Sequence, residues 1–252
     1  MIISIVNHKG GTGKTTTTVN LGSALAKEGC KVLLIDFDAQ GNLSYSLGLT
    51  EFKNSIAHVL LGECTLTQAT YASENLFLIP TNHSLADVEI SIANSTDRFG
   101  YLKDVLSTEL EYDYVLIDCP PSLSLLSANA LMASHAVIIP MQMEVLAVKG
   151  LEMMLETIAK VKSTLNPSLE ILGVLPVMAD VRKNLYREIV EYVKENFQVP
   201  IFNSSIRACV KAAEAPSFGK SVLEYAPLST AATDYTAFAQ EVIHCTQLVN
   251  PN

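Results

Sequence analysis

Short apolar segments alternate with longer helical patterns along this chain, and this alternation constrains its fold more than any other feature. The apolar segments are rich in Val, Ile and Leu without strict alternation, which is typical of strands covered on both faces. They comprise residues 2–6, 31–35, 76–79, 114–117, 136–140 and 170–174. Helical patterns occupy residues 15–29, 151–165 and 184–197. This order predicts an α/β fold: a mostly parallel twisted sheet with helices on both faces.

Composition limits the class of protein. The chain has 252 residues, 49% of them hydrophobic, and a mean hydropathy of +0.28, so it can bury a large core and is not intrinsically disordered. No repeat, low-complexity tract or linker divides it, and residues 1–252 are therefore predicted to form a single domain. The net charge of −9 argues against a generally basic nucleic-acid binder but is compatible with a local basic patch.

Cysteine usage and the first residues indicate the compartment. The five cysteines are odd in number and show no CxxC spacing, which argues against a disulfide framework or a zinc site and favours reduced thiols. Residues 1–6 have the pattern of an opening strand and lack the basic start of a signal peptide. No apolar run approaches the roughly 18 residues of a membrane-spanning helix. We therefore expect a cytoplasmic protein without a membrane partner.

A glycine-rich loop, residues 7–16, lies between the first predicted strand and the first predicted helix. Glycines let a backbone wrap around phosphate oxygens, and the following helix N-terminus adds N–H donors and a favourable dipole. In such a loop Lys14 would reach the β- and γ-phosphates of a nucleotide, and the Thr15 hydroxyl would bind Mg²⁺. The common GxxxxGK[ST] pattern is not matched, because His8 occupies the place of its first glycine. A turn that only joins strand to helix is the alternative.

The loop Lys9-Gly-Gly-Thr-Gly-Lys-Thr-Thr16 resembles the deviant Walker A loop of the ParA/MinD group of P-loop ATPases. The resemblance implies that Lys9 crosses an ATP-bound homodimer and touches the nucleotide of the partner subunit. A second cation near the γ-phosphate would offset charge that develops during transfer. The resemblance also implies that ATP and Mg²⁺ are the cofactors, and that the nucleotide-binding residues are Gly10, Gly11, Thr12, Gly13, Lys14, Thr15 and Thr16.

Two carboxylate motifs support this resemblance. Residues 33–42 resemble the A′ motif of the family, with Ala39 in place of its proline, and residues 115–122 resemble the Walker B strand and turn. The resemblance assigns three catalytic residues, Lys9, Lys14 and Asp38, and a metal site formed by Thr15, Asp36 and Asp118. Asp38 would orient the attacking water. Taken alone, each aspartate could equally be a strand-end or helix-capping residue.

The second half of the chain indicates the branch of the family. Residues 124–150 and 206–222, including Glu214-Ala-Pro-Ser217, are similar to the ParA/Soj group of partition ATPases. MinD is the nearest alternative, that is, a non-DNA positioning ATPase that acts as a nucleotide-gated binding module. However, the C-terminal segment 237–252 contains no Lys or Arg, so it should bind anionic lipid poorly. We expect its apolar positions to pack onto the domain instead.

The ParA resemblance further implies nonspecific DNA binding by the ATP dimer, a stimulatory ParB-like partner protein and association with the nucleoid. Such a protein partitions a plasmid or chromosome, or positions another cargo. Residues 176–225 hold seven basic and six acidic residues, so positive charge is concentrated in this part of the chain. The candidate DNA contacts are Arg182, Lys183, Arg187, Arg207 and Lys211. An ordinary solvated helix face is the alternative interpretation.

Overall fold

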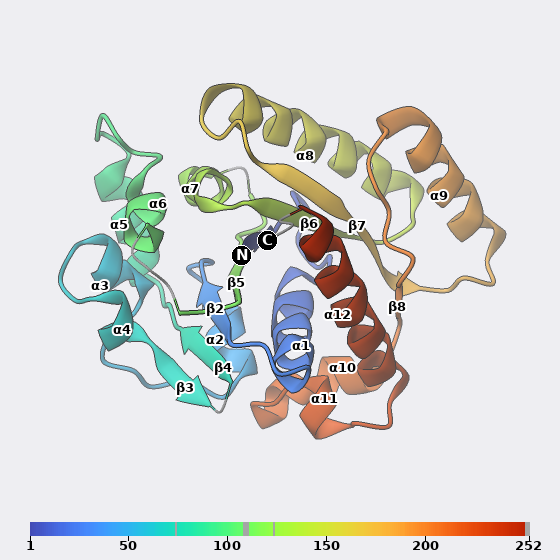
Figure 1. Ribbon diagram of the computed structural model, residues 1–252, viewed down its shortest axis with the longest axis horizontal. Coiled ribbons are helices and arrows are strands. Elements are labelled where there is room, and N and C mark those ends of the chain that lie inside the picture. Colours follow the sequence, from blue (N-terminus) through green and yellow to red (C-terminus); the bar gives the residue numbers. More distant parts are fainter. Residues whose placement is uncertain (74, 108–110, 123, 250–252) are drawn as a thin grey trace.

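The computed structural model describes residues 1–73, 75–107, 111–122 and 124–249 (Figure 1). Within them, eight strands form one sheet in the order β3-β4-β2-β5-β1-β6-β7-β8. Neighbouring strands pair in parallel except β3 and β4, which are antiparallel. The strands are β1 (Ile2–Ile5), β2 (Val32–Asp36), β3 (Tyr71–Ser73), β4 (Leu76–Ile79), β5 (Tyr114–Asp118), β6 (Ala136–Met141), β7 (Glu170–Ala179) and β8 (Ile206–Arg207). The predicted fold class is confirmed.

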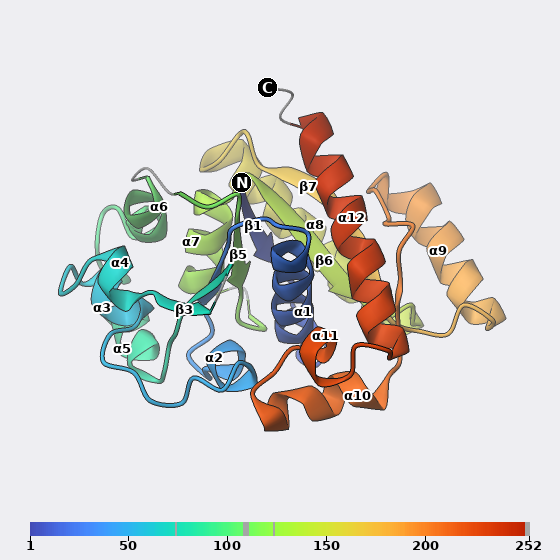
Figure 2. The same cartoon turned by 60° about the horizontal axis from the view of Figure 1, so that its bottom comes forward.

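Helices cover both faces of the sheet (Figure 2). In chain order they are α1 (Lys14–Lys27), α2 (Asn42–Ser46), α3 (Ile56–Leu60), α4 (Leu66–Ala69), α5 (Ser84–Ile92), α6 (Tyr101–Leu106), α7 (Leu125–Ala133), α8 (Val145–Thr164), α9 (Asn184–Phe197), α10 (Val210–Glu214), the 3₁₀ helix η1 (Ala215–Phe218), α11 (Val222–Tyr225) and α12 (Thr230–Val249). Helices α1 and α12 pack on one face, whereas α5 to α9 pack on the other.

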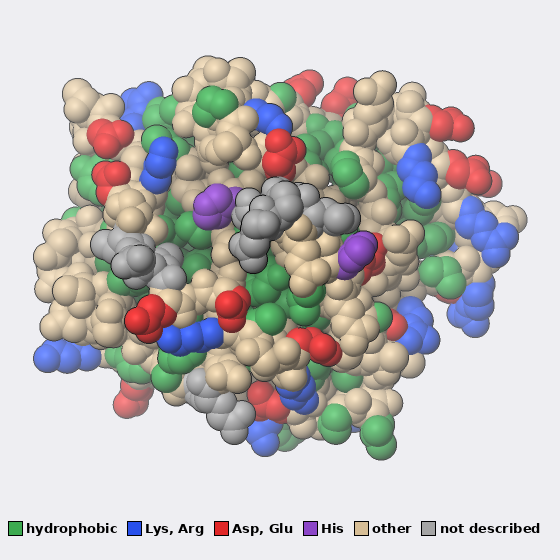
Figure 3. Space-filling model, in the orientation of Figure 1, with side chains coloured by type: hydrophobic (Ala, Val, Ile, Leu, Met, Phe, Trp, Pro, Cys, Tyr) green, Lys and Arg blue, Asp and Glu red, His purple; other side chains and the backbone are tan. Residues whose placement is uncertain are grey.

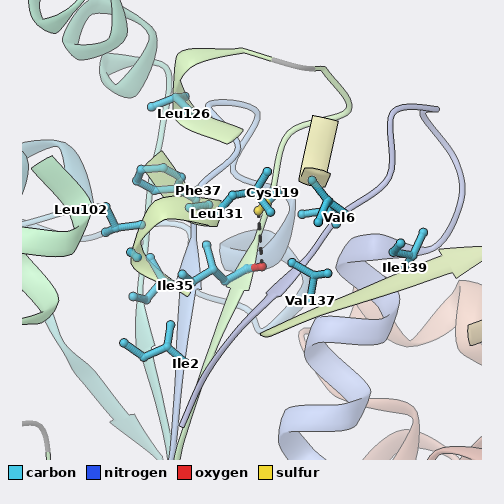
Figure 4. Close-up of a cluster of buried hydrophobic side chains, with 14 of the residues drawn as sticks. Ile2, Val6, Ile35, Phe37, Leu102, Cys119, Leu126, Leu131, Val137 and Ile139 are labelled. Carbon is cyan, nitrogen blue, oxygen red and sulfur yellow. Dashed lines mark hydrogen bonds between the residues drawn. The ribbon is translucent and has the colours of Figure 1, made fainter. Parts of the chain in front are cut away.

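Two apolar cores, one on each face, explain why the central strands have uninterrupted apolar sequences. Successive side chains of a strand point to opposite faces. Accordingly, Leu33 and Ile35 of β2 enter the core beneath α5 to α9, while Val32 and Leu34 enter the core beneath α1 and α12. Figure 4 shows part of the first core, in which Ile35 lies with Leu131 and Val137. Both faces of β2 are therefore fully covered.

Two of the predicted elements are shorter than the observed ones. The strand predicted at residues 170–174 continues to Ala179, because Leu175 and Val177 are buried in the sheet on either side of Pro176. The helix predicted from residue 151 begins at Val145, and its first turn carries exposed apolar side chains that disrupt the amphipathic pattern. The edge strands β3 and β8 are not predicted, since strands of two or three residues leave almost no periodic signal.

The C-terminal segment forms α12 and packs onto the domain, as expected. Phe238 and Val242 are fully buried, and the Phe238 ring meets Phe202 edge-on at a centroid distance of 4.9 Å. The Thr246 hydroxyl lies 2.7 Å from the Tyr114 hydroxyl. Residues 250–252 of this segment lie outside the described residues. Across the described chain, no helix combines the length and apolar character needed to cross a membrane. All five cysteines are free thiols.

Candidate nucleotide site

The glycine-rich loop follows β1 and leads directly into α1. Asn7 anchors its start: the Nδ2 amide donates to the Pro140 carbonyl on β6 (2.7 Å), and Oδ1 accepts from the Lys9 N–H (2.9 Å). Gly11 and Gly13 have φ of 72° and 76°, in the left-handed region that glycine adopts without steric cost. Gly13 is the N-cap of α1 and has no side chain that could accept from the first-turn N–H groups, so these donors are left for a ligand. This geometry suits an anion.

Lys14 lies at the base of this loop and is buried. Its Nζ donates to the Lys9 carbonyl at 3.2 Å, and the Thr12 hydroxyl donates to the same oxygen, also at 3.2 Å. Burial lowers the pKa of the Lys14 ammonium, while Asp118 and Asp38 oppose that shift. Lys14 therefore carries a positive charge that is largely removed from water and only partly compensated. A phosphate group in the loop would complete its coordination.

Two buried aspartates meet where β2 and β5 end. Asp36 and Asp118 are register partners on neighbouring parallel strands, so their carboxylates lie close together. Asp118 accepts hydrogen bonds from the Thr15 hydroxyl (2.7 Å) and the Thr18 hydroxyl (3.3 Å). Burial, reinforced by the charge of Asp36, raises the pKa of Asp118 to about 8. The pair thus places two carboxyl groups directly beneath the start of α1, and a cation bound beside them would favour their ionised form.

Asp36 also holds the loop that follows β2. Its Oδ2 accepts from both the N–H (2.8 Å) and the hydroxyl (2.6 Å) of Ser44 on α2. The Ser44 hydroxyl oxygen accepts in turn from the Thr81 N–H at 3.2 Å. The other oxygen of Asp36, Oδ1, is buried without a hydrogen-bond partner among the described residues. Burial raises the pKa of Asp36 to about 7. Asp36 therefore fixes α2 and retains one unused acceptor.

A cavity of about 290 Å³ brings most of the predicted phosphate-site residues together. It is lined by residues 10–16 of the loop, by Asp38, and by Asn42, Ser46 and Pro121. The sequence analysis missed the last three as site residues. Asn42 could have been predicted from its place in the A′ motif. Ser46 could not, because only the fold brings this end of α2 to the cavity. Asp38 accepts from the Gln40 N–H at 3.1 Å. Lys9 is exposed and does not line the cavity.

Comparison with known proteins identifies the family. Residues 1–171 match a family described as AAA domain. The chain is 42% identical to the chromosome partitioning protein ParA of Caulobacter vibrioides, covering 96% of this chain and 93% of that protein. It is also 42% identical to the sporulation initiation inhibitor protein Soj of Bacillus subtilis, covering 96% and 97%. This chain belongs to the ParA/Soj family of partition ATPases.

A solved structure resembles this ParA/Soj family member over nearly its whole length. It is cobyrinic acid a,c-diamide synthase from Mycobacterium smegmatis with a bound ATP analogue and magnesium. The TM-score is 0.86 and the sequence identity 34%, covering 98% of this chain and 95% of that one. The similarity confirms that the present fold is that of a P-loop ATPase.

The buried carboxyl pair beneath the loop suits a divalent cation. Mg²⁺ prefers oxygen ligands and is held in nucleotide sites by one or two carboxylates together with phosphate oxygens. Asp118, the Thr15 hydroxyl and the unpartnered Oδ1 of Asp36 supply oxygen donors of this kind. In addition, Asp36, Asp38 and Asp118 are all buried, and among the described residues Lys14 is the one buried lysine, so a further positive charge would stabilise their ionised forms. The residues present therefore fit this ion.

A second, more apolar cavity of about 390 Å³ adjoins the loop and shares Gly13 and Thr16 with the first. Its other walls come from the end of β7, from β8 and α10, and from Tyr235 of α12. Met178 of β7 lines it with a left-handed backbone, φ 50°, which is unusual for a residue other than glycine. An apolar cavity that opens beside a phosphate-binding loop suits the base of a nucleotide.

The five candidate DNA contacts lie near one sheet edge but differ in how their charges are compensated. Arg207 of β8 donates to Asp234 of α12, with Nη2 to Oδ1 at 2.6 Å. Arg182 pairs with Asp180, and Lys211 pairs with Glu214 at 2.8 Å. Lys183 and Arg187, at the start of α9, form no ion pair within the described residues. Figure 3 shows blue side chains on the flank occupied by α9, with acidic ones among them.

Proposed function

We propose that this chain is an ATP-dependent switch that dimerises on ATP, binds DNA without sequence preference and partitions a plasmid, a chromosome or another cargo. A ParB-like partner protein would stimulate hydrolysis and release the dimer from DNA. The observation that carries the proposal is the single cavity in which the glycine loop, Lys14, Thr15 and Asp38 meet above the buried Asp36–Asp118 pair. The similarity to ParA and Soj over nearly the full length supports it.

The proposed chemistry is attack of water on the γ-phosphate of ATP. The loop N–H groups and Lys14 would hold the phosphates and offset their charge, and Asp38 would orient the water. Mg²⁺, held by Thr15 and Asp118 with Asp36 supporting its shell, supplies charge neutralisation at the phosphate oxygens. The second cavity would take the adenine base, with Cys209, Val210 and Tyr235 among its walls.

Dimerisation would complete the site. Lys9 is exposed, does not line the cavity of its own subunit, and makes no ion pair in the described part of the chain. Such a cation is available to a facing subunit. We therefore propose that each protomer places Lys9 against the nucleotide of its partner, which would make dimer formation depend on ATP.

DNA is the proposed partner of the flank that carries α9. Lys183 and Arg187 provide cations that form no ion pair with any other described residue, and a dimer would present two copies of this flank. Arg207 and Lys211 would contribute less in this conformation, because their charges are already compensated by Asp234 and Glu214. A membrane partner is not proposed, since the buried Phe238 and Val242 use the apolar face of α12 inside the protein.

Retention on DNA tests the proposal directly. The protein is passed over immobilised DNA of unrelated sequences with Mg²⁺ and either ATP, ADP or no nucleotide, while its oligomeric state is measured by light scattering. We expect dimers and DNA retention with ATP alone, at similar strength for every sequence, with steep weakening as salt rises. Dimerisation with ATP but without retention would favour a non-DNA positioning ATPase. If nucleotide is not bound, the whole proposal is wrong.

A further inference from the structure

The two cavities are lined in part by two segments that are far apart in sequence. These segments come close to each other at two glycines. Helix α2 brings Asn42 and Ser46 to the phosphate cavity, and Gly48 follows it. Helix α10 lines the apolar cavity, and η1 continues from it to Gly219. In Figure 2, α2 lies beside the orange segment that holds α10 and α11. Gly48 and Gly219 approach each other where these segments meet, and α2 also lies against η1 there.

This contact joins backbone to backbone and has no room for a side chain. A Cβ atom on Gly219 would lie 2.8 Å from the Gly48 Cα and 3.1 Å from its nitrogen. A Cβ on Gly48 would lie 3.3 Å from the Gly219 Cα. Both residues have left-handed backbones, with φ of 74° and 64°. A displacement of one segment therefore cannot be absorbed by rotation of an intervening side chain.

Each segment is also tied to the phosphate site on its other side. The Ser44 hydroxyl and N–H attach α2 to Asp36, next to Asp118. Asn20 of α1 accepts from the Val222 N–H at 2.7 Å and donates to the Thr16 carbonyl at 2.7 Å. The Lys27 ammonium donates to the Leu223 carbonyl at 2.9 Å. The Gly48–Gly219 contact thus closes a ring of contacts around the two cavities.

We propose that the Gly48–Gly219 contact couples the phosphate cavity to α10 and η1, so that a γ-phosphate held beside α2 stabilises the segment that lines the other cavity. The inference rests on the proposed function and names a regulatory link within the same site. Coupling of this kind requires packed elements that respond together, and by linkage it acts in both directions. It would also make the placement of Lys211, on α10, depend on the third phosphate.

Amide hydrogen exchange measures this coupling. The full-length protein with Mg²⁺ is compared with ADP and with a non-hydrolysable ATP analogue, each at saturation. In the unaltered protein we expect exchange at residues 210–219 to be about five-fold slower or more with the analogue than with ADP, the lower end of typical coupling between sites. Gly219→Ala should abolish this difference, while both nucleotides still protect residues 10–16.

Gly62→Ala is the matched control. Gly62 has a left-handed backbone of φ 73°, but a Cβ there would meet nothing within 4 Å, so this change adds similar strain without a collision. The difference at residues 210–219 should persist in it. If Gly219→Ala does not fold, Gly48→Ala replaces it in the test, because its Cβ would come less close to the facing backbone. The inference is overturned if the unaltered protein shows no analogue-over-ADP difference, or if a folded Gly219→Ala or Gly48→Ala retains it. Failure to protect residues 10–16 in the unaltered protein would instead refute nucleotide binding itself.

Discussion

Three charged residues of the phosphate site differ sharply in their surroundings, and we propose different roles for them on this basis. Lys14 is buried and bonded within the loop, Asp38 lies at the cavity wall, and Lys9 is exposed outside it. A buried cation can act only on a ligand of its own subunit, whereas an exposed one can reach a neighbour. The predictions at this scale test separately the proposed water-orienting role of Asp38 and the proposed cross-dimer role of Lys9.

Asp38→Ala should lower ATP hydrolysis about 100-fold or more, the lower range for loss of a general base or water-positioning group. ATP binding should remain, because Lys14 and the loop are untouched, so the variant should accumulate as an ATP-bound dimer. Steady-state phosphate release and light scattering measure the two effects. Asp87→Ala, an exposed aspartate on α5, is the control and should hydrolyse normally. Hydrolysis at the unaltered rate by Asp38→Ala would disprove the assignment.

Lys9→Ala should remove partner-stimulated hydrolysis while ATP binding by the monomer persists. The stimulated rate is expected to fall about 100-fold, as when one charge-stabilising donor is lost from a transition state. Lys103→Ala removes a comparable exposed lysine from α6 and should leave stimulation intact. A mixed-dimer assay with Asp38→Ala sharpens the test, because under the proposal Lys9 would act on the nucleotide of the facing subunit. Normal stimulation of Lys9→Ala homodimers would exclude the cross-subunit role.

At the scale of elements, the ion pairs determine at which basic residues a mutation can test DNA binding. Arg207→Glu would place a carboxylate against Asp234, so lost DNA retention in that variant could reflect disruption between β8 and α12. Lys183 and Arg187, at the start of α9, form no ion pair with the rest of the described chain. DNA binding is therefore best tested at α9.

Lys183→Glu combined with Arg187→Glu should strongly reduce ATP-dependent retention on DNA of every sequence. The slope of log affinity against log salt should fall by about 1 for each phosphate contact removed. Lys53→Glu with Lys103→Glu changes the net charge equally at other exposed positions and should have a much smaller effect. ATP-dependent dimerisation should be unchanged in both double variants. Undiminished retention after the α9 changes would move the DNA site to another surface.

At the scale of the whole molecule, the packing of α12 shows that the C-terminal segment is part of the core. Its side chains fill the core beneath α1, and the Phe202–Phe238 and Tyr114–Thr246 contacts join it to distant parts of the chain. A segment that supplies core residues cannot leave the domain without exposing them to water. The stability of the fold should therefore depend on α12.

Phe238→Ala should destabilise the protein by about 3–5 kcal/mol, because a fully buried aromatic ring is replaced by a cavity. Leu228→Ala, at a side chain that is 99% exposed, should change stability by about 0.5 kcal/mol or less. Urea unfolding followed by circular dichroism gives both values. Equal stability of the two variants would show that α12 contributes little to the core.

The sequence alone determined the central architecture and the phosphate loop, because both depend on local pattern. Strands buried on both faces must be continuously apolar, and a loop that wraps phosphate must use glycine where φ is positive, as at Gly11 and Gly13. Charge placement was different. Whether Arg207 is free or bound to Asp234, and whether Ser46 reaches the cavity, depend on side chains that only folding brings together. The same holds for Gly48 and Gly219, because contact between residues so far apart in sequence leaves no periodic trace in the chain.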